Sequence, residues 1–114
     1  MCGIVGVVGD KNAVNTIIDG LSILESRGYD SAGLATMSAQ NAIVTTKYAS
    51  GNNGNAVGRL REHVADHAGN SVGIGHTRWA THGGKTDENA HPHNDAKNRL
   101  ALVHNGIIEN SHAL

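Results

Sequence analysis

The chain has 114 residues, of which 39% are hydrophobic, and this is the size of one small domain. Its formal net charge is -1, from nine basic and ten acidic side chains, so it lacks the basic surface of proteins that bind nucleic acid or anionic membranes. No apolar stretch approaches the ~20 residues that span a bilayer, residues 1–9 lack a basic leader, and a single cysteine excludes a disulfide framework. We therefore expect a cytoplasmic protein with no nucleic-acid or membrane partner.

The first half of the chain predicts a strand, a helix and a hairpin. Residues 4–8 form a continuous apolar run, which is typical of a short strand buried on both faces. Apolar residues at helical spacing predict a helix that begins after Asn12 and ends near Gly28. Residues 32–37 and 42–48 have the composition of two strands, and the turn residues between them indicate a hairpin.

A second helix is predicted over residues 56–68, and strands are predicted over 72–76 and 100–103. His63 and His67 are one helical turn apart and could chelate a metal, but we expect them on the solvent-exposed face of the helix. Glycine alternates with larger residues in the first of these strands, which indicates that its glycine face contacts another backbone.

The stretch from Thr77 to Lys97 has almost no periodic hydrophobicity, and it is too long for a simple connection, so we expect a functional loop. A guanidinium at the end of a strand could bind a carboxylate through two parallel hydrogen bonds, which makes Arg78 a candidate. The Thr81 hydroxyl and the Trp79 indole could shape the rest of a small polar pocket. A surface loop with the arginine in solvent and the tryptophan in the core is an equally weighted alternative.

Histidines gather in the same part of the chain and raise the alternative of a metal site. The candidates are His82, His91 and His93, and Pro92 stiffens the backbone between the last two. Zinc sites usually need three or four ligands that include Cys or carboxylate, and the only thiol lies far away in sequence. We therefore predict no metal and no cofactor, and we keep a histidine-rich metal-binding module as an alternative function.

Cys2 directly follows the initiator methionine and is the only cysteine. Once Met1 is removed, this residue carries a thiol nucleophile and a free α-amine that can act as its local base. Its apolar surroundings also fit an inert, buried cysteine. Near the end of the chain, the Asn105 side-chain amide and the Gly106 N–H form a suitable pair of donors for an oxyanion, although an ordinary Asn-Gly turn is the simpler alternative.

Together these segments resemble the glutaminase domain of the glutamine–fructose-6-phosphate aminotransferases (glucosamine-6-phosphate synthases), which are class II glutamine amidotransferases. The matching stretches lie in order over nearly the whole chain, at residues 2–6, 27–33, 76–83, 89–93 and 103–110. The amidotransferases that form phosphoribosylamine share the Cys-Gly-Ile start but typically differ in the second and third stretches, so they are the second alternative. The resemblance implies an α+β fold, the N-terminal-nucleophile hydrolase sandwich of two antiparallel sheets between helical layers, and residues 1–114 would be its first part.

The resemblance also implies a reaction. Cys2 would attack the side-chain amide of L-glutamine, form a thioester and release the ammonia used to make glucosamine 6-phosphate from fructose 6-phosphate. Asn105 and the Gly106 N–H would stabilise the oxyanion, and Arg78 would hold the substrate α-carboxylate. Further implied roles are substrate contacts for Thr81 and His82, gating of ammonia passage for Trp79, communication with the acceptor site for His91, and organisation of the pocket wall for Arg27 and Asp30.

In this family further strands, an acidic residue that binds the substrate amino group, and C-terminal sugar isomerase domains follow the matched region. Residues 1–114 contain none of these, so we expect the isolated segment to hydrolyse glutamine weakly or not at all, and we expect the isomerase domains as its partners. If Met1 is retained, Cys2 has no free amine and should be a poor catalyst.

Overall fold

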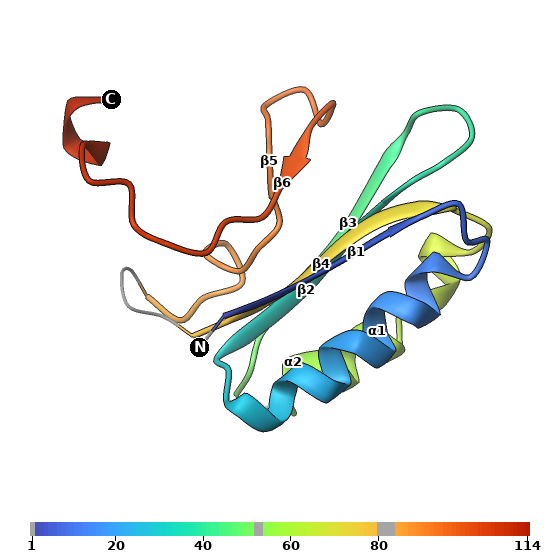
Figure 1. The fold of residues 1–114 in the computed structure, drawn as a ribbon, viewed down its shortest axis with the longest axis horizontal. Coiled ribbons are helices and arrows are strands. Elements are labelled where there is room, and N and C mark those ends of the chain that lie inside the picture. Colours follow the sequence, from blue (N-terminus) through green and yellow to red (C-terminus); the bar gives the residue numbers. More distant parts are fainter. Residues whose placement is uncertain (1, 52–53, 80–83) are drawn as a thin grey trace.

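The structure, a computed structural model, describes residues 2–51, 54–79 and 84–114, and within them a four-stranded antiparallel sheet forms the framework (Figure 1). Across the sheet, its strands are β1 (Gly3–Val8), β4 (Val72–Arg78), β2 (Ser31–Met37) and β3 (Ile43–Ala49). The predicted α+β class and the predicted β2–β3 hairpin are confirmed.

One face of the sheet is covered by α1 (Ala13–Leu24) and α2 (Ala56–Arg61) (Figure 1). The first predicted helix is confirmed, because α1 continues directly into the 3-10 turn η1 (Glu25–Arg27). Its fully buried Ile17, Ile18 and Leu21 anchor the core, and each such side chain contributes roughly 1.5–3 kcal/mol on burial.

The second predicted helix is shorter than expected, since α2 ends at Arg61 and only the 3-10 turn η2 (Val64–His67) follows. The expectation that His67 is exposed is wrong. His67 is 1% exposed, and its Nδ1 and Nε2 lie 2.7 Å and 2.9 Å from the hydroxyls of Thr36 and Thr46. The turn brings the imidazole back onto the sheet, where two hydroxyls satisfy both nitrogens.

The expectation that β1 is buried on both faces is also wrong. Ile4 and Val8 are 47% and 84% exposed, because β1 is an edge strand and only its Val5 side packs against α1. The glycine face of β4 contacts helix side chains more than backbone. A Cβ on Gly73 would lie 2.6 Å from Cδ1 of Ile17. The absence of side chains on this face lets α1 pack closely on the sheet.

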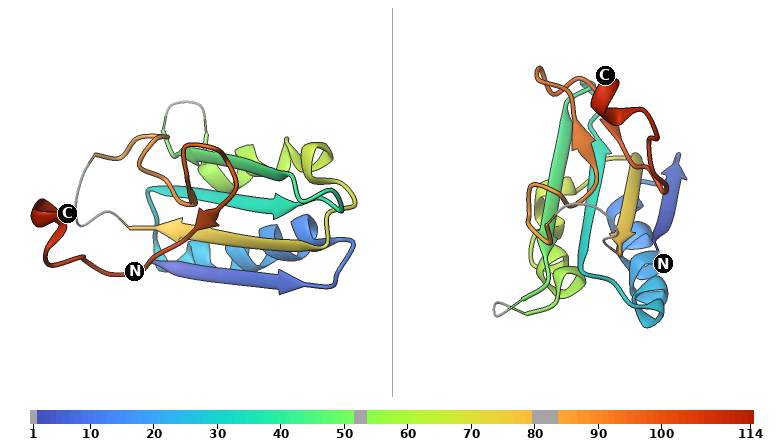
Figure 2. Two further views of the ribbon diagram at one scale, coloured as in Figure 1. Left: turned by 90° about the horizontal axis from the view of Figure 1, so that it is seen from above. Right: turned by 90° about the vertical axis from the view of Figure 1, so that its left-hand side faces the viewer.

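Residues 84–114 lie on the other face of the sheet, opposite the helices (Figures 1 and 2). They include the short pair β5 (His93–Asn94) and β6 (Ala101–Leu102) and the 3-10 turn η3 (Ser111–Ala113). The strand predicted over 100–103 is therefore present but shorter. No described helix has the length and apolar character needed to cross a membrane.

Candidate active site

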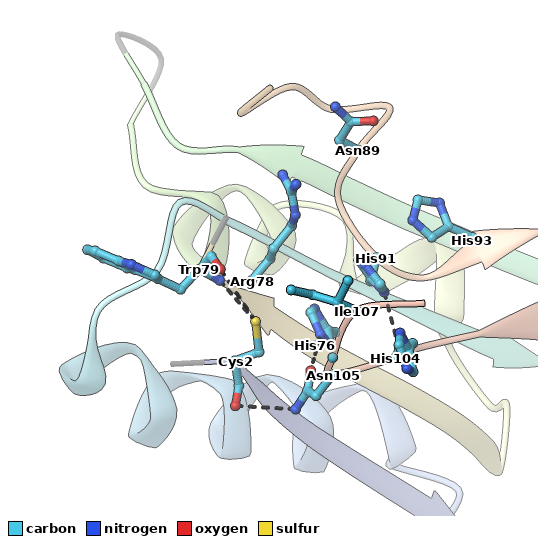
Figure 3. A pocket seen from close by; sticks show the side chains of 11 residues that line it. Cys2, His76, Arg78, Trp79, Asn89, His91, His93, His104, Asn105 and Ile107 are labelled. Atoms are coloured by element: carbon cyan, nitrogen blue, oxygen red, sulfur yellow. Dashed lines mark hydrogen bonds between the residues drawn. The ribbon is translucent and has the colours of Figure 1, made fainter. Parts of the chain in front are cut away.

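A cleft of about 740 Å³ lies on the open face of the sheet, between the start of β1, the end of β4 and the segment that crosses above them (Figure 3). Six residues predicted to act in catalysis or substrate binding line it, namely Cys2, Arg78, Trp79, His91, Asn105 and Gly106, and so does His93, a candidate metal ligand in the sequence. Thr81, His82 and the side chain of Arg27 lie outside the described part of the chain. The sequence interpretation gave no role to His76, Asn89 and His104, which also line the cleft.

Strand pairing places the thiol. β1 runs antiparallel to β4 with Gly3 opposite Thr77, so the residue before β1 meets the residues at the end of β4. The Trp79 backbone N–H donates to Cys2 Sγ at 3.2 Å, and Sγ lies 3.7 Å from the Trp79 carbonyl oxygen (Figure 3). An N–H directed at sulfur stabilises negative charge on it, as a nucleophilic thiolate requires.

The side-chain amide of Asn105 connects Cys2, just before β1, with His76 of β4. Its Nδ2 donates to the Cys2 carbonyl oxygen at 3.3 Å, and its Oδ1 lies 2.7 Å from His76 Nε2 (Figure 3). Gly106 follows at φ +142°, a left-handed conformation that favours glycine, so the turn depends on this residue type. The amide therefore points its N–H₂ group at the residue that carries the thiol.

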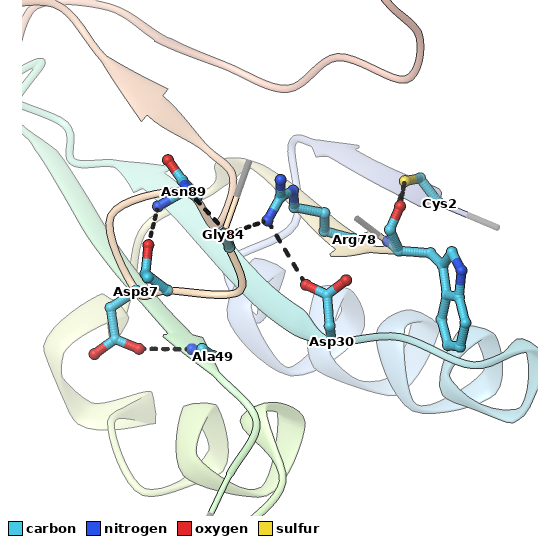
Figure 4. Close-up of polar contacts among 9 residues, drawn as sticks. Cys2, Asp30, Ala49, Arg78, Gly84, Asp87 and Asn89 are labelled. Atoms are coloured by element: carbon cyan, nitrogen blue, oxygen red, sulfur yellow. Dashed lines mark hydrogen bonds and ion pairs between the residues drawn. The ribbon is translucent and has the colours of Figure 1, made fainter. Parts of the chain in front are cut away.

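Arg78 is only 8% exposed and is held from two sides (Figure 4). Its Nη1 donates to the Gly84 carbonyl oxygen at 3.0 Å and lies 3.8 Å from Asp30 Oδ1. Asn89 Nδ2 donates to the same carbonyl at 2.9 Å, which ties the loop to the arginine. The guanidinium is thus fixed at the cleft by a buried carboxylate and a loop carbonyl.

Trp79 is 49% exposed, so the alternative with the arginine in solvent and the tryptophan in the core is wrong for both side chains. The indole covers Gly28, where an added Cβ would lie 2.9 Å from Cζ3 of the ring. Gly28 has φ +86°, and both its backbone conformation and the nearby ring select glycine.

A row of imidazoles forms another wall of the cleft. The rings of His76 and His91 are stacked with centroids 4.2 Å apart and planes 20° apart, and His93 lies 4.4 Å from His91. Burial, followed by neighbouring histidines and cations, lowers the pKa of His91 to about 4. Burial also lowers the pKa of His76 and of His93, so these rings are neutral at neutral pH.

Backbone packing holds His91 against the sheet. Gly33 of β2 lies directly below it, and a Cβ there would overlap the His91 carbonyl oxygen. Lys47 of β3 donates from Nζ to the carbonyl oxygens of Pro92 and Glu88, each at 3.1 Å.

Among residues 2–51, 54–79 and 84–114, no three His, Cys, Asp or Glu side chains are placed to hold a metal ion.

No protein-family model matches the chain. The chain is 56% identical over 110 residues to the glutamine–fructose-6-phosphate aminotransferase (isomerizing) of Streptomyces coelicolor. It is 53% identical over 113 residues to the protein of that name in Streptococcus pneumoniae, and 50% identical over 113 residues to that of Mycolicibacterium smegmatis. Each match covers 96% of the chain but only 17% or 18% of the relative.

These identities confirm the family predicted from the sequence and do not favour the phosphoribosylamine-forming alternative or the metal-binding module. The chain is a homologue of the N-terminal part of the isomerizing glutamine–fructose-6-phosphate aminotransferases.

Proposed function

We propose that the chain is the first part of a glutaminase domain and that Cys2 cleaves the side-chain amide of L-glutamine. In the whole protein, the released ammonia would serve glucosamine-6-phosphate synthesis from fructose 6-phosphate on the C-terminal sugar isomerase domains. The observation that carries the proposal is the meeting of the Cys2 thiol, the Asn105 amide and the Arg78 guanidinium in one cleft. The antiparallel sheet with helices on one face would be the first half of an N-terminal-nucleophile hydrolase sandwich.

The reaction begins with removal of Met1, which leaves Cys2 with a free α-amine. This amine takes the thiol proton while Sγ forms a bond to the amide carbon of glutamine. The carbonyl oxygen becomes an oxyanion, which accepts hydrogen bonds from Asn105 Nδ2 and the Gly106 N–H. When the tetrahedral intermediate collapses, the α-ammonium passes its proton to the amide nitrogen, the carbon–nitrogen bond breaks, and the nitrogen leaves as ammonia. Water then hydrolyses the thioester to glutamate.

The surrounding residues bind and shield the substrate. Arg78 offers a planar set of N–H donors suited to the α-carboxylate of glutamine, and its position is fixed by Asp30 and Gly84. Trp79 would control the passage of ammonia, and His91 would communicate with the acceptor site. Thr81 and His82 would add substrate contacts, and Arg27 would organise the pocket wall with Asp30.

The test is labelling of the whole protein with a diazoketone analogue of glutamine. The wild-type protein should gain one adduct, located by peptide mass at a Cys2 whose methionine has been removed. Cys2→Ala should gain none, whereas Ser22→Ala, at a hydroxyl on α1 bonded to the Ile18 carbonyl, should label like the wild type. Undiminished labelling of Cys2→Ala would overturn the proposal.

A further inference from the structure

His76 lies at the cleft, yet the reaction above gives it no part. Its exposed fraction is 0%, and strand register places it between Ile4 of β1 and Gly33 of β2 in the middle of the sheet. A buried histidine with no chemical role is expected to contribute through its hydrogen bonds and packing. Its Nε2 forms a side-chain hydrogen bond with Asn105, the proposed oxyanion donor.

The geometry fixes which atoms of Asn105 and His76 face each other. Asn105 Nδ2 donates to the Cys2 carbonyl oxygen, so the amide oxygen is the atom that faces the ring. An amide oxygen can only accept a hydrogen bond, and therefore His76 Nε2 must carry the proton. Burial lowers the pKa of His76, so the ring is neutral and the proton sits on Nε2 rather than on both nitrogens.

This hydrogen bond selects one of two orientations of the amide. The two ends of an asparagine amide have nearly the same shape, so only their partners decide which end points where. In the flipped orientation, Asn105 Oδ1 would face the Cys2 carbonyl oxygen and Nδ2 would face the His76 N–H. Both contacts would then join groups of like polarity, and the site would lose its donor.

His76 is the stronger of the two anchors. Its contact with Oδ1 is 2.7 Å, while the contact of Nδ2 with the Cys2 carbonyl is 3.3 Å. Asn105 Nδ2 has two N–H donors, so one can stay on the Cys2 carbonyl while the other faces the oxyanion, and His76 holds the opposite end of the amide. The ring is itself held by the stacked His91, whose Nδ1 accepts from the His104 N–H at 3.3 Å.

We propose that His76 is a positioning residue, whose Nε2–H holds the Asn105 amide with its N–H₂ group toward Cys2 before substrate binds. The inference rests on the proposed function, since Asn105 matters as an oxyanion donor only if Cys2 attacks an amide. It assigns His76 no contact with the substrate, so its effect should fall on kcat and not on KM.

The test compares three variants of the whole protein in glutamine hydrolysis. His76→Phe keeps a planar ring but removes the donor. Its kcat should fall about 10-fold, and its KM should stay within twofold of the wild-type value. This loss of kcat is smaller than the about 10²–10³-fold loss that is typical when an oxyanion donor is removed outright. His76→Gln restores an N–H donor and should recover at least half of the lost kcat. His76→Leu offers neither a donor nor an acceptor and should be no faster than the phenylalanine variant.

Two further measurements separate positioning from misfolding. The rate at which methyl methanethiosulfonate modifies Cys2 should be the same in the wild type and in His76→Phe, because this reagent needs no oxyanion donor. In the unmodified wild type, long-range ¹⁵N–¹H spectra should show the proton of His76 on Nε2. A proton on Nδ1, a kcat of His76→Phe equal to wild type, or an effect confined to KM overturns the inference.

Failure of this inference and of the proposed function are distinguishable. A wild-type protein that neither hydrolyses glutamine nor reacts with its diazoketone analogue removes the proposed function, and with it the role of His76. A wild-type protein that is active, while His76→Phe is equally active, removes only the positioning role.

Discussion

His76, His91 and His93 form the histidine wall of the cleft. The tight contact between Gly33 and the backbone of His91 leads to our sharpest prediction about this wall. In Gly33→Ala, the new Cβ would overlap the His91 carbonyl oxygen and would lie 2.6 Å from the Cβ of Lys47. The best separation of two carbon atoms is about 3.5–4.0 Å, so the neighbouring backbone must move by roughly 1 Å. Both obstacles belong to backbone or to an atom attached to it, so rotation of a side chain cannot relieve them.

Overpacking of this kind costs about 1–3 kcal/mol of unfolding free energy. The displaced His91 would no longer stack on His76, and misplacement of about 1 Å near a reacting group can reduce a rate about 10²-fold. We therefore expect Gly33→Ala to unfold at lower urea concentration and to react much more slowly with the diazoketone analogue of glutamine.

Gly6→Ala is the matched control, because Gly6 lies in the same sheet and a Cβ there would meet nothing within 4 Å. This variant should be neutral, or more stable by about 0.4–1 kcal/mol through loss of freedom in the unfolded chain. Equal urea midpoints and equal labelling rates for the two variants would refute the argument that the histidine wall needs the space above Gly33.

Three other perturbations follow from the same structure. Asp30→Asn removes the carboxylate beside the buried Arg78, so the unfolding free energy should fall by ~3–5 kcal/mol in urea titrations and KM for glutamine should rise; an unchanged midpoint would contradict the pairing. Burial holds the pKa of His91 at about 4, below the ordinary ~6.5, so between these pH values the unfolded chain binds protons that the folded chain does not. Thermal stability should therefore fall as pH decreases from about 6.5 to 4, and His91→Phe should flatten this dependence; identical slopes would count against it. Gly28→Ala should displace the indole of Trp79, the only tryptophan, and shift its fluorescence to longer wavelength, whereas an unchanged spectrum would show that the ring does not rest on Gly28.

The parts of the fold that were predicted from the sequence depend on local patterns. Helical spacing of apolar residues located α1, and the turn residues between the stretches 32–37 and 42–48 located the β2–β3 hairpin. The errors have non-local causes. Ile4 is exposed because β1 is an edge strand, and strand order depends on contacts between distant segments.

Residue type alone made Cys2, Arg78 and Asn105 candidates, and only the resemblance to the glutaminase family gave each of them a role; the structure brings them into one cleft. The role proposed for His76 was missed, because its position beside Asn105 follows from strand register and from a loop that crosses the sheet. His67 was misplaced, because the helical pattern continued beyond Arg61 although the helix did not. The available hint was a histidine at the end of the strand predicted over residues 72–76, two residues before the candidate Arg78.

Cys2 lies one residue before the edge strand β1, so the register of β1 in the sheet determines where the nucleophilic thiol points. Neighbouring residues of a strand point to opposite sides, so a slip of β1 along β4 by a single residue would turn Cys2 toward the helices and bring Gly3 to the cleft. The face on which the sulfur emerges is therefore encoded by how the apolar side chains of β1 dock on α1, several residues away from the chemistry.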